Sequence, residues 1–245
     1  MTPHRVFIVG HEGTTGLRIH ERLSDRKDIE LLATADEDRK NVEAIKVVAK
    51  KADLVFLCLP DVASKEIMAA IGDFPCKVID TSTAFRTTAG WAYGFPELGE
   101  SYKTAIATKK HIANPGCHAS GMIACIAPLV KAGLVPADYP FTITSLTGYS
   151  GGGKKMIGQY ESSPKDYFLY APRQYGLGQE HKHLPEVQHV CGLSEAPIFM
   201  PIVDDYYSGM EVTVGIHSRL CHKPVCIDKV QQTLEYFYKD STIVT

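Results

Sequence analysis

Strand-length apolar runs alternate with helix-length amphipathic stretches along the first half of the chain. The apolar runs are nearly continuous, which is typical of strands covered by helices on both faces of a parallel sheet. This pattern predicts strands at His4–Gly10, Ile29–Ala35, Asp53–Pro60 and Lys77–Thr81, and helices at Thr15–Leu23, Val42–Lys51 and Ala63–Ile71. The β-α-β rhythm with short connections therefore predicts an α/β domain with a doubly wound, Rossmann-like parallel sheet.

The second half of the chain differs, because apolar and polar residues alternate along its strand-length segments. Such alternation is typical of antiparallel sheets with one solvated face. It predicts strands at Phe141–Tyr149, Ile198–Val203 and Glu211–Ser218, and helices at Ala119–Ala132 and Asp228–Tyr238. We expect a first domain over residues 1–116 and an α+β domain with a mainly antiparallel sheet over residues 117–245. The Gly- and Tyr-rich stretch Gly148–Gln179 is expected to be a functional or mobile loop.

Composition and charge narrow the class of protein. The chain has 245 residues, of which 44% are hydrophobic and 22% charged, as expected of a globular protein with a real core. The 26 Lys and Arg against 28 Asp and Glu give a net charge of −2, which argues against nucleic-acid binding. No apolar run is long enough for a membrane helix, and the N-terminal stretch does not fit a secretory signal.

The chain contains seven cysteines, at positions 58, 76, 117, 125, 191, 221 and 226. This odd number, with Cys58 and Cys125 inside apolar runs, argues against a disulfide scaffold and favours free thiols in a reducing cytoplasm. We therefore expect one chemically active cysteine and six that serve packing.

A glycine-rich turn, Gly10-His-Glu-Gly13-Thr-Thr-Gly16, follows the first strand and opens the first helix. Its glycines allow a tight turn and a close approach by a pyrophosphate, which the free N–H groups of the helix start would bind. The alternative is an ordinary glycine turn. The second strand is followed by Asp36–Lys40. Acidic residues there would bind the free ribose 2′-hydroxyl of NAD, and basic residues would bind the 2′-phosphate of NADP. Because the segment carries both kinds, the residues alone do not choose between the two cofactors.

A cysteine lies in a second turn, Asn114-Pro-Gly-Cys117-His-Ala-Ser120, where a short strand meets a helix. The positive end of a helix dipole favours a thiolate, and Pro115 and Gly116 shape a turn that exposes the sulfur. We expect Cys117 to be the only cysteine at a helix start. This placement favours a covalent nucleophile over a packing residue.

Two imidazoles and a carboxylate stand within six positions, in His181-Lys-His183-Leu-Pro-Glu186. Histidine has the near-neutral pKa that proton transfer in thiol chemistry needs. Surface histidines or a zinc site are the alternatives. The segment lacks the H-E-x-x-H spacing, and the set His217, Cys221, His222 and Cys226 fits no familiar zinc finger, so we expect no metal.

Two further segments offer groups that could hold an anion. Asp80-Thr-Ser-Thr-Ala-Phe-Arg86 follows the fourth strand, at the edge where such sheets bind ligands. The planar fork of Arg86 suits a phosphate, and a surface salt bridge is an equal alternative. Tyr149-Ser-Gly-Gly-Gly-Lys-Lys155 is compatible with an anion cradle or with a flexible hinge.

Together these segments resemble the N-acetyl-γ-glutamyl-phosphate reductase family in its shorter bacterial form. The resembling segments run in family order: Val9–Gly16, Cys58–Pro60, Asp80–Arg86, Asn114–Ser120, Thr147–Lys154 and His181–Glu186. The resemblance implies the third step of arginine biosynthesis, the reversible NADPH-dependent reduction of N-acetyl-L-glutamate 5-phosphate to the 5-semialdehyde. It further implies that Cys117 expels phosphate from the acyl phosphate to leave a thioester.

The resemblance also assigns roles to the candidate residues. It implies NADP(H) as the cofactor, Cys117 as the nucleophile and His181 as the favoured proton donor. The expected cofactor-binding residues are Gly10, Gly13, Thr14, Thr15, Gly16 and Pro60, together with Arg39, which is chosen for its charge and its place after the second strand and not from the resemblance. The expected substrate-binding residues are Ser82, Arg86, Asn114, His183 and Glu186. We expect a cytoplasmic homodimer or homotetramer that binds neither nucleic acid nor membrane.

Two alternative functions stay open, and the end of the chain bears on the second of them. Family members usually continue into a segment with a Lys-Gly-Ala-like turn, and none follows Thr245, so we expect a shortened version of a longer protein. An acyl-phosphate reductase of the aspartate-semialdehyde dehydrogenase type is one alternative function. A non-catalytic NADP-binding protein is the other.

Overall fold

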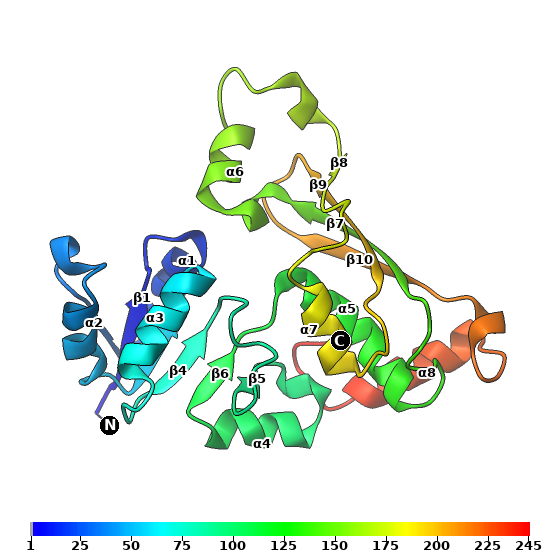
Figure 1. Cartoon of the computed structure of the whole chain (residues 1–245), viewed down its shortest axis with the longest axis horizontal. Coiled ribbons are helices and arrows are strands. Elements are labelled where there is room, and N and C mark those ends of the chain that lie inside the picture. The colour runs from blue at the N-terminus through cyan, green and yellow to red at the C-terminus, as the bar shows by residue number, and fades with distance from the viewer. Residues whose placement is uncertain (1) are drawn as a thin grey trace. The chain divides into compact units, whose positions relative to one another are not determined.

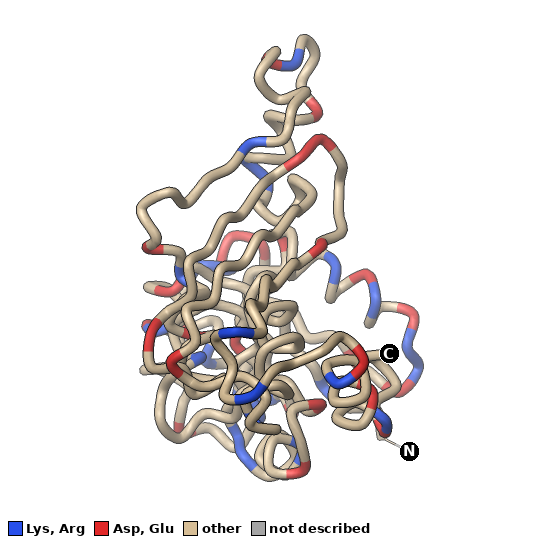
Figure 2. The backbone as a smooth tube through the Cα atoms, turned by 90° about the vertical axis from the view of Figure 1, so that its right-hand side faces the viewer, with Lys and Arg blue, Asp and Glu red and all other residues tan. Residues whose placement is uncertain are grey.

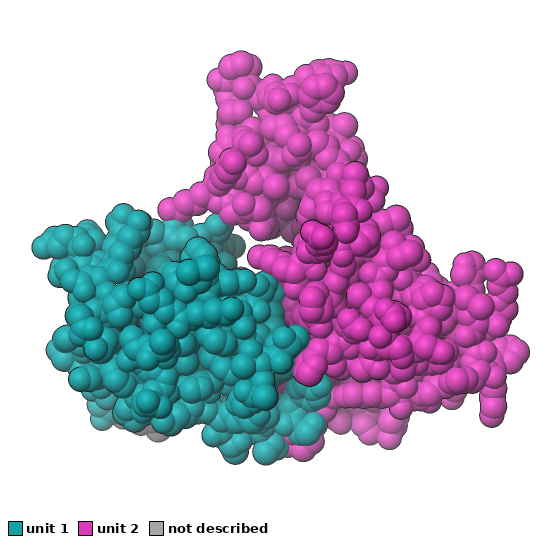
Figure 3. Space-filling view, viewed as in Figure 1, with its two compact units in different colours: residues 1–94, 101–115 teal, residues 95–100, 116–245 magenta. Residues whose placement is uncertain are grey.

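The structure of the protein, a computed structural model, describes residues 2–245 (Figure 1). These residues form two compact units, shown separately coloured in Figure 3. The first unit comprises the residues up to Gly94 together with Ser101–Pro115, and the second comprises Phe95–Glu100 together with Gly116–Thr245. Lys and Arg positions and Asp and Glu positions are interspersed along the backbone (Figure 2), and the net charge of the chain is −2.

The first unit is built on a six-stranded sheet with the order β2-β1-β3-β4-β6-β5, in which every neighbouring pair is parallel. The strands are β1 (His4–Val9), β2 (Ile29–Leu32), β3 (Leu54–Leu57), β4 (Lys77–Asp80), β5 (Ala92–Tyr93) and β6 (His111–Ala113). The helices are α1 (Thr14–Ser24), α2 (Val42–Ala49), α3 (Asp61–Ile71) and α4 (Glu100–Thr108). The predicted doubly wound parallel sheet is confirmed, and α4 and β5 are additions that the pattern did not predict.

Strand order in this sheet decides where a ligand can bind. β1 pairs with β2 on one side and with β3 on the other, so the chain reverses its winding direction at β1. Val55 and Leu57 of β3 are fully buried and pack in one core with residues of α2 and α3. The carboxyl ends of β1 and β3 are therefore neighbours, which is the position where open parallel sheets bind ligands.

The second unit contains a four-stranded sheet with the order β10-β7-β9-β8. Its strands are β7 (Thr142–Gly148), β8 (Arg173–Gln174), β9 (Ile198–Asp204) and β10 (Met210–Gly215). Its helices are α5 (Cys117–Lys131), α6 (Gly153–Tyr160), α7 (Leu184–Cys191) and α8 (Ile227–Tyr238). The pairing β10–β7 is antiparallel as predicted, and β8, which the sequence pattern did not predict, also pairs antiparallel with β9, whereas the central pair β7–β9 is parallel. The sheet is therefore mixed.

Helix α5 covers one face of this sheet. Ile143, Ser145 and Phe199 alternate with half-exposed residues along β7 and β9 and are nearly fully buried. Gly121 of α5 lets the helix approach β10 closely, because a Cβ atom there would lie 2.6 Å from a side-chain carbon of Val212. α5 also packs against α7 and α8.

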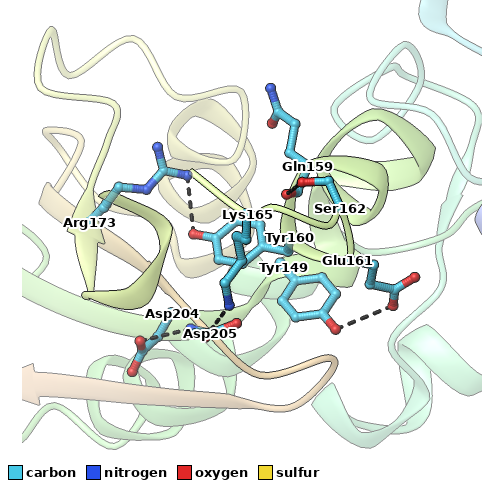
Figure 4. A network of polar contacts seen from close by, with 9 residues as sticks. All are labelled: Tyr149, Gln159, Tyr160, Glu161, Ser162, Lys165, Arg173, Asp204 and Asp205. Carbon is cyan, nitrogen blue, oxygen red and sulfur yellow. Dashed lines mark hydrogen bonds and ion pairs between the residues drawn. The ribbon is translucent and has the colours of Figure 1, made fainter. Parts of the chain in front are cut away.

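The expectation of a loop over Gly148–Gln179 is wrong in part, because helix α6 and strand β8 lie within it. A small core of Tyr160, Leu169 and Val203 orders the segment, with Tyr149 and Tyr175 among the residues packed against it. Polar contacts surround this core (Figure 4): Lys165 Nζ lies 2.5 Å from Asp205 Oδ2, and Arg173 donates to the Tyr160 hydroxyl at 3.1 Å. Aromatic packing thus fixes the segment.

Among residues 2–245, no helix combines the length and the apolar character needed to cross a bilayer.

Candidate active site

The glycine turn between β1 and α1 has the geometry of an anion site. Gly10 has φ +84°, and a Cβ atom on it would lie 2.4 Å from the Cys58 carbonyl oxygen. A Cβ on Gly16 would lie 2.3 Å from the Gly10 carbonyl oxygen. Gly13 precedes α1 and supplies no capping side chain, so the N–H groups of Thr14 and Thr15 at the helix start are available to a ligand. These residues fit the pyrophosphate of a dinucleotide.

Two further residues border this turn. Arg39, beyond the end of β2, forms an ion pair with Glu12 of the glycine turn, with Arg39 Nη1 2.5 Å from Glu12 Oε1. Glu12 was not singled out from the sequence, and it holds the guanidinium beside the place where a phosphate would bind. Pro60, next to β3, precedes α3 as its N-cap residue and is exposed.

The segment after β4 is held by buried polar contacts. The Asp80 carboxylate accepts hydrogen bonds from the hydroxyls of Ser64 at 2.6 Å and Ser82 at 2.5 Å, and burial raises its pKa. Arg86, 8% exposed, donates from Nε to the Asn114 carbonyl at 3.0 Å and from Nη2 to the Thr81 carbonyl at 3.1 Å. The Ser82 hydroxyl and the Arg86 guanidinium therefore stabilise this loop through their hydrogen bonds, whereas Asn114 is exposed.

The second unit carries the cysteine. Cys117 is the first residue of α5 and is exposed, and the first turn of that helix contains no acidic residue. Gly116 comes just before it, and its backbone N–H donates to Oε1 of Glu186 at 2.8 Å. Glu186 lies on α7 and is only 1% exposed. A buried carboxylate thus anchors the turn that presents the sulfur.

The other cysteines have different surroundings. Burial raises the pKa of Cys58 to about 11 and that of Cys191 to about 12, so both thiols stay protonated at neutral pH. All seven cysteines lie within the described residues and carry free thiols. The expectation that Cys117 alone marks a helix start is wrong, because Cys226 is exposed and is the N-cap residue of α8. Cys226 makes a natural control for Cys117.

The predicted histidines come together around a buried phenylalanine. The rings of His181 and His183 are 4.7 Å apart, and the His181 ring lies 5.1 Å from that of Phe199. Burial, with a smaller effect from the charge of Lys182, lowers the pKa of His181, so its imidazole is neutral at pH 7. The His183 backbone N–H donates to Nδ1 of His181 at 3.3 Å, which leaves the proton of the neutral ring on Nε2.

A third histidine and a tyrosine belong to the cluster and were missed from the sequence. His118 follows Cys117 in α5 and is 3% exposed, and its ring lies 5.6 Å from that of His181. Its Nε2 is 2.8 Å from the hydroxyl oxygen of Tyr175, the residue after β8. Burial first, and the charge of Cys117 second, raise the pKa of Tyr175 to about 12. Tyr175 therefore belongs to the cluster of three histidines through its contacts with His118 and His181.

Within residues 2–245, no group of three or more His, Cys, Asp and Glu side chains is arranged to hold a metal ion. The three clustered imidazoles instead contact each other and the aromatic rings of Tyr175 and Phe199. The arrangement thus supplies a thiol, imidazoles and a phenol for covalent and proton-transfer chemistry.

Family models match nearly the whole chain in two parts. Residues 5–106 match a model described as "Semialdehyde dehydrogenase, NAD binding domain", and residues 117–245 match one described as "Semialdehyde dehydrogenase, dimerisation domain". These matches separate the glycine turn of the first unit from the Cys–His cluster of the second, as the structure does.

Relatives with closely similar sequences narrow the family. N-acetyl-gamma-glutamyl-phosphate reductase of Chelativorans sp. (strain BNC1) is 47% identical over 220 residues, which are 90% of this chain and 70% of the relative. N-acetyl-gamma-glutamyl-phosphate reductase 2 of Pseudomonas putida (strain KT2440) is 44% identical over 96% of this chain and 74% of the relative. The chain belongs to the N-acetyl-γ-glutamyl-phosphate reductase family. Membership of this oxidoreductase family confirms the resemblance drawn from the sequence.

Solved structures support the fold of this N-acetyl-γ-glutamyl-phosphate reductase family member. Aspartate semialdehyde dehydrogenase II from Vibrio cholerae aligns with a TM-score of 0.70 at 18% identity, over 96% of this chain and 79% of that one. Aspartate semialdehyde dehydrogenase with NADP from Candida albicans aligns with a TM-score of 0.66 at 16% identity, over 95% of this chain and 76% of that one. The semialdehyde dehydrogenase fold is thereby confirmed.

Proposed function

We propose that the chain reduces N-acetyl-L-glutamate 5-phosphate to N-acetyl-L-glutamate 5-semialdehyde with NADPH, a step of arginine biosynthesis. The observation that carries this proposal is the exposed Cys117 at the start of α5, in a turn anchored by the buried carboxylate of Glu186, in a unit that also holds a cluster of three imidazoles. The names of relatives up to 47% identical supply the substrate.

In this proposal, Cys117 is the nucleophile. Its thiolate attacks the acyl carbon of the substrate, a C–S bond forms, and the C–O bond to the phosphate breaks, which leaves a thioester and free phosphate. When bound, NADPH supplies the hydride that reduces this thioester. Loss of the Cys117 thiolate then releases the aldehyde and returns the sulfur to its starting state.

His181 is proposed as the proton donor. Its Nδ1 accepts the N–H of His183, so the neutral ring presents an Nε2–H group. That group is suited to donate to the acyl oxygen as negative charge develops on it. Glu186 is proposed to act by holding Gly116 and thereby the nucleophile. His183 remains a proposed substrate-binding residue. Ser82, Arg86 and Asn114 are also proposed to bind the substrate, through the phosphate that leaves.

The proposed cofactor site is the glycine turn. Gly10, Gly13 and Gly16 admit the pyrophosphate, and Thr14 and Thr15 offer it their N–H groups. Arg39 is the proposed ligand of the 2′-phosphate and Pro60 a further cofactor contact; the ion pair between Arg39 and Glu12 supports the first assignment by holding the guanidinium beside the turn.

We further propose a cytoplasmic homo-oligomer, either a dimer or a tetramer. The family model described as a dimerisation domain, which matches residues 117–245, supports the assembly. The free thiols of all seven cysteines fit a reducing compartment.

One assay tests the function. The protein is incubated with NADP⁺, phosphate and either N-acetylglutamate semialdehyde or aspartate semialdehyde, and the absorbance of the reduced cofactor is followed. We expect NADP⁺ to be reduced when the N-acetylated aldehyde is the substrate. Preference for aspartate semialdehyde identifies the alternative reductase, and cofactor binding with neither aldehyde oxidised identifies a non-catalytic NADP-binding protein.

A further inference from the structure

An ion pair connects the glycine turn to the segment that follows β2. Arg39 Nη1 lies 2.5 Å from Glu12 Oε1, and 27 positions separate the two residues. Both side chains are open to solvent in part, with 41% of the Arg39 side chain and 48% of the Glu12 side chain exposed. A ligand bound at the glycine turn can therefore reach both charged groups.

Ordered backbone holds each partner in place. The Gly13 N–H donates to the Gly10 carbonyl at 3.0 Å and closes a turn that has Glu12 at its third position. Arg39 lies between a short 3₁₀ helix, Asp36–Asp38, and the N-cap residue of α2. These two segments bring one carboxylate and one guanidinium together at the edge of the parallel sheet where such folds bind the ribose of a dinucleotide.

The guanidinium of Arg39 keeps most of its hydrogen-bonding capacity. It contacts Glu12 through a single nitrogen, Nη1, and within residues 2–245 its Nε and Nη2 donate to no protein atom. A guanidinium has five N–H donors in one plane, so these two nitrogens are able to bind a second anion. The 2′-phosphate of NADP is such an anion.

A bound 2′-phosphate and the Glu12 carboxylate would share one cation. Both anions would contact the same planar group, so only a few ångströms would separate them. A phosphate monoester carries a charge of about −1.5 to −2 at pH 7, whereas Arg39 brings one positive charge. Like charges at this separation repel each other, and salt screens the repulsion. The ribose of NAD has an uncharged hydroxyl at this position, which a carboxylate does not repel.

The neighbouring charges do not offset Glu12. The 3₁₀ helix before Arg39 consists of Asp36, Glu37 and Asp38, and Lys40 is the one further cation of this segment. Residues 36–40 therefore have no surplus of positive charge that would cancel the repulsion between Glu12 and a phosphate.

We propose that Glu12 is a specificity-determining residue that weakens the preference for NADP over NAD. Arg39 attracts the 2′-phosphate, and Glu12 opposes that attraction without opposing the hydroxyl of NAD. The inference rests on the proposed function, in which Arg39 is the ligand of the 2′-phosphate. Removal of the Glu12 charge should therefore favour NADP alone.

Fluorescence titrations of NADPH and NADH with the whole chain, in the absence of substrate, test this role. Glu12→Gln removes the charge and keeps the size and an oxygen acceptor. We expect the dissociation constant for NADPH to fall by about threefold to tenfold, the effect of one unit charge at this separation, and the constant for NADH to stay at the wild-type value. The gain should shrink as salt is raised from about 20 mM to about 500 mM, because ions screen the repulsion.

Glu21→Gln is the matched control. Glu21 is an exposed carboxylate within α1 that lies 3.4 Å from Nη1 of Arg18. The variant therefore loses the same charge and an exposed ion pair of the same unit, and leaves the glycine turn as it is. Both of its dissociation constants should equal those of the wild type.

Three results for Glu12→Gln would overturn the proposal. A higher dissociation constant for NADPH identifies the carboxylate as a clamp for Arg39. An unchanged constant shows that the charge has no effect, and an equal gain for NADH shows that the effect is not specific to the phosphate.

Arg39→Gln separates this inference from the proposed function. Lower NADPH affinity in Arg39→Gln, with no gain in Glu12→Gln, overturns the role of Glu12 and leaves the phosphate ligand in place. Wild-type NADPH affinity in Arg39→Gln removes that ligand and overturns both assignments. None of these titrations requires turnover, so an absence of reductase activity is a separate result.

Discussion

Acidification should destabilise the protein through His118. Burial lowers the pKa of this imidazole to about 4, from an ordinary value of 6.5. Between these values the unfolded chain binds a proton at this position and the folded chain does not. The free energy of unfolding therefore keeps its full value above about pH 6.5 and decreases as the pH falls toward 4. The difference corresponds to about 3 kcal/mol.

Urea unfolding at a series of pH values measures this effect, and His118→Gln isolates it. Glutamine offers an amide donor and acceptor to Ser145 and Tyr175 but does not titrate. His181, whose pKa burial also lowers, contributes a loss of the same sign in both proteins. We expect the wild type to lose about 3 kcal/mol more than His118→Gln across this window. Parallel pH dependences in the two proteins would refute the reasoning.

Three further predictions concern the two turns. Glu186→Ala should lower the free energy of unfolding by about 2 kcal/mol or more and reduce kcat, because it leaves the Gly116 N–H without its carboxylate. Glu186→Gln retains an acceptor and should keep most of the stability and most of kcat, so equal kcat in the two variants contradicts the anchoring role. Mass spectrometry after brief iodoacetamide treatment should find Cys117 labelled faster than Cys226, which is also exposed, and equal rates argue against activation at the start of α5. Gly10→Ala should abolish NADPH binding measured by fluorescence and lower the melting temperature, because φ of +84° and a neighbouring carbonyl oxygen leave no place for a Cβ. A variant that binds NADPH with wild-type affinity contradicts the assigned cofactor site.

The parallel sheet could be predicted because its elements carry strong periodic signals. β1, β3 and β4 are apolar runs bounded by turn residues, and the structure shortens or shifts them by only a few residues. The two-residue strands β5 and β8 have no period to detect, and their pairing depends on partners elsewhere in the chain.

The segment between β7 and β9 shows a second limit. Its glycines and serines resemble a loop, yet the stacked rings of Tyr149 and Tyr160, 4.7 Å apart, belong to a small core that orders it. The parallel pairing of β7 with β9 likewise follows from the path of the intervening chain and not from residue alternation.

The placement of the candidate site residues was predictable where a local motif carries them. Cys117 in its Pro-Gly turn and the pair His181 and His183 are local patterns, and the structure groups the two histidines as expected. His118 was missed because a histidine on a helix has no distinctive signal. Tyr175 was missed because 57 positions separate it from its partner His118, so that only the fold brings them together.

The central claim is that the acyl group passes through the sulfur of Cys117. The most direct test is the intact mass of the protein after mixing with N-acetylglutamyl phosphate in the absence of NADPH, followed by peptide mapping. We expect one N-acetylglutamyl group on Cys117 that disappears when NADPH is added, and no such adduct in Cys117→Ser. An unmodified wild-type protein that still reduces the acyl phosphate, or a Cys117→Ser variant that turns over normally, would contradict the account.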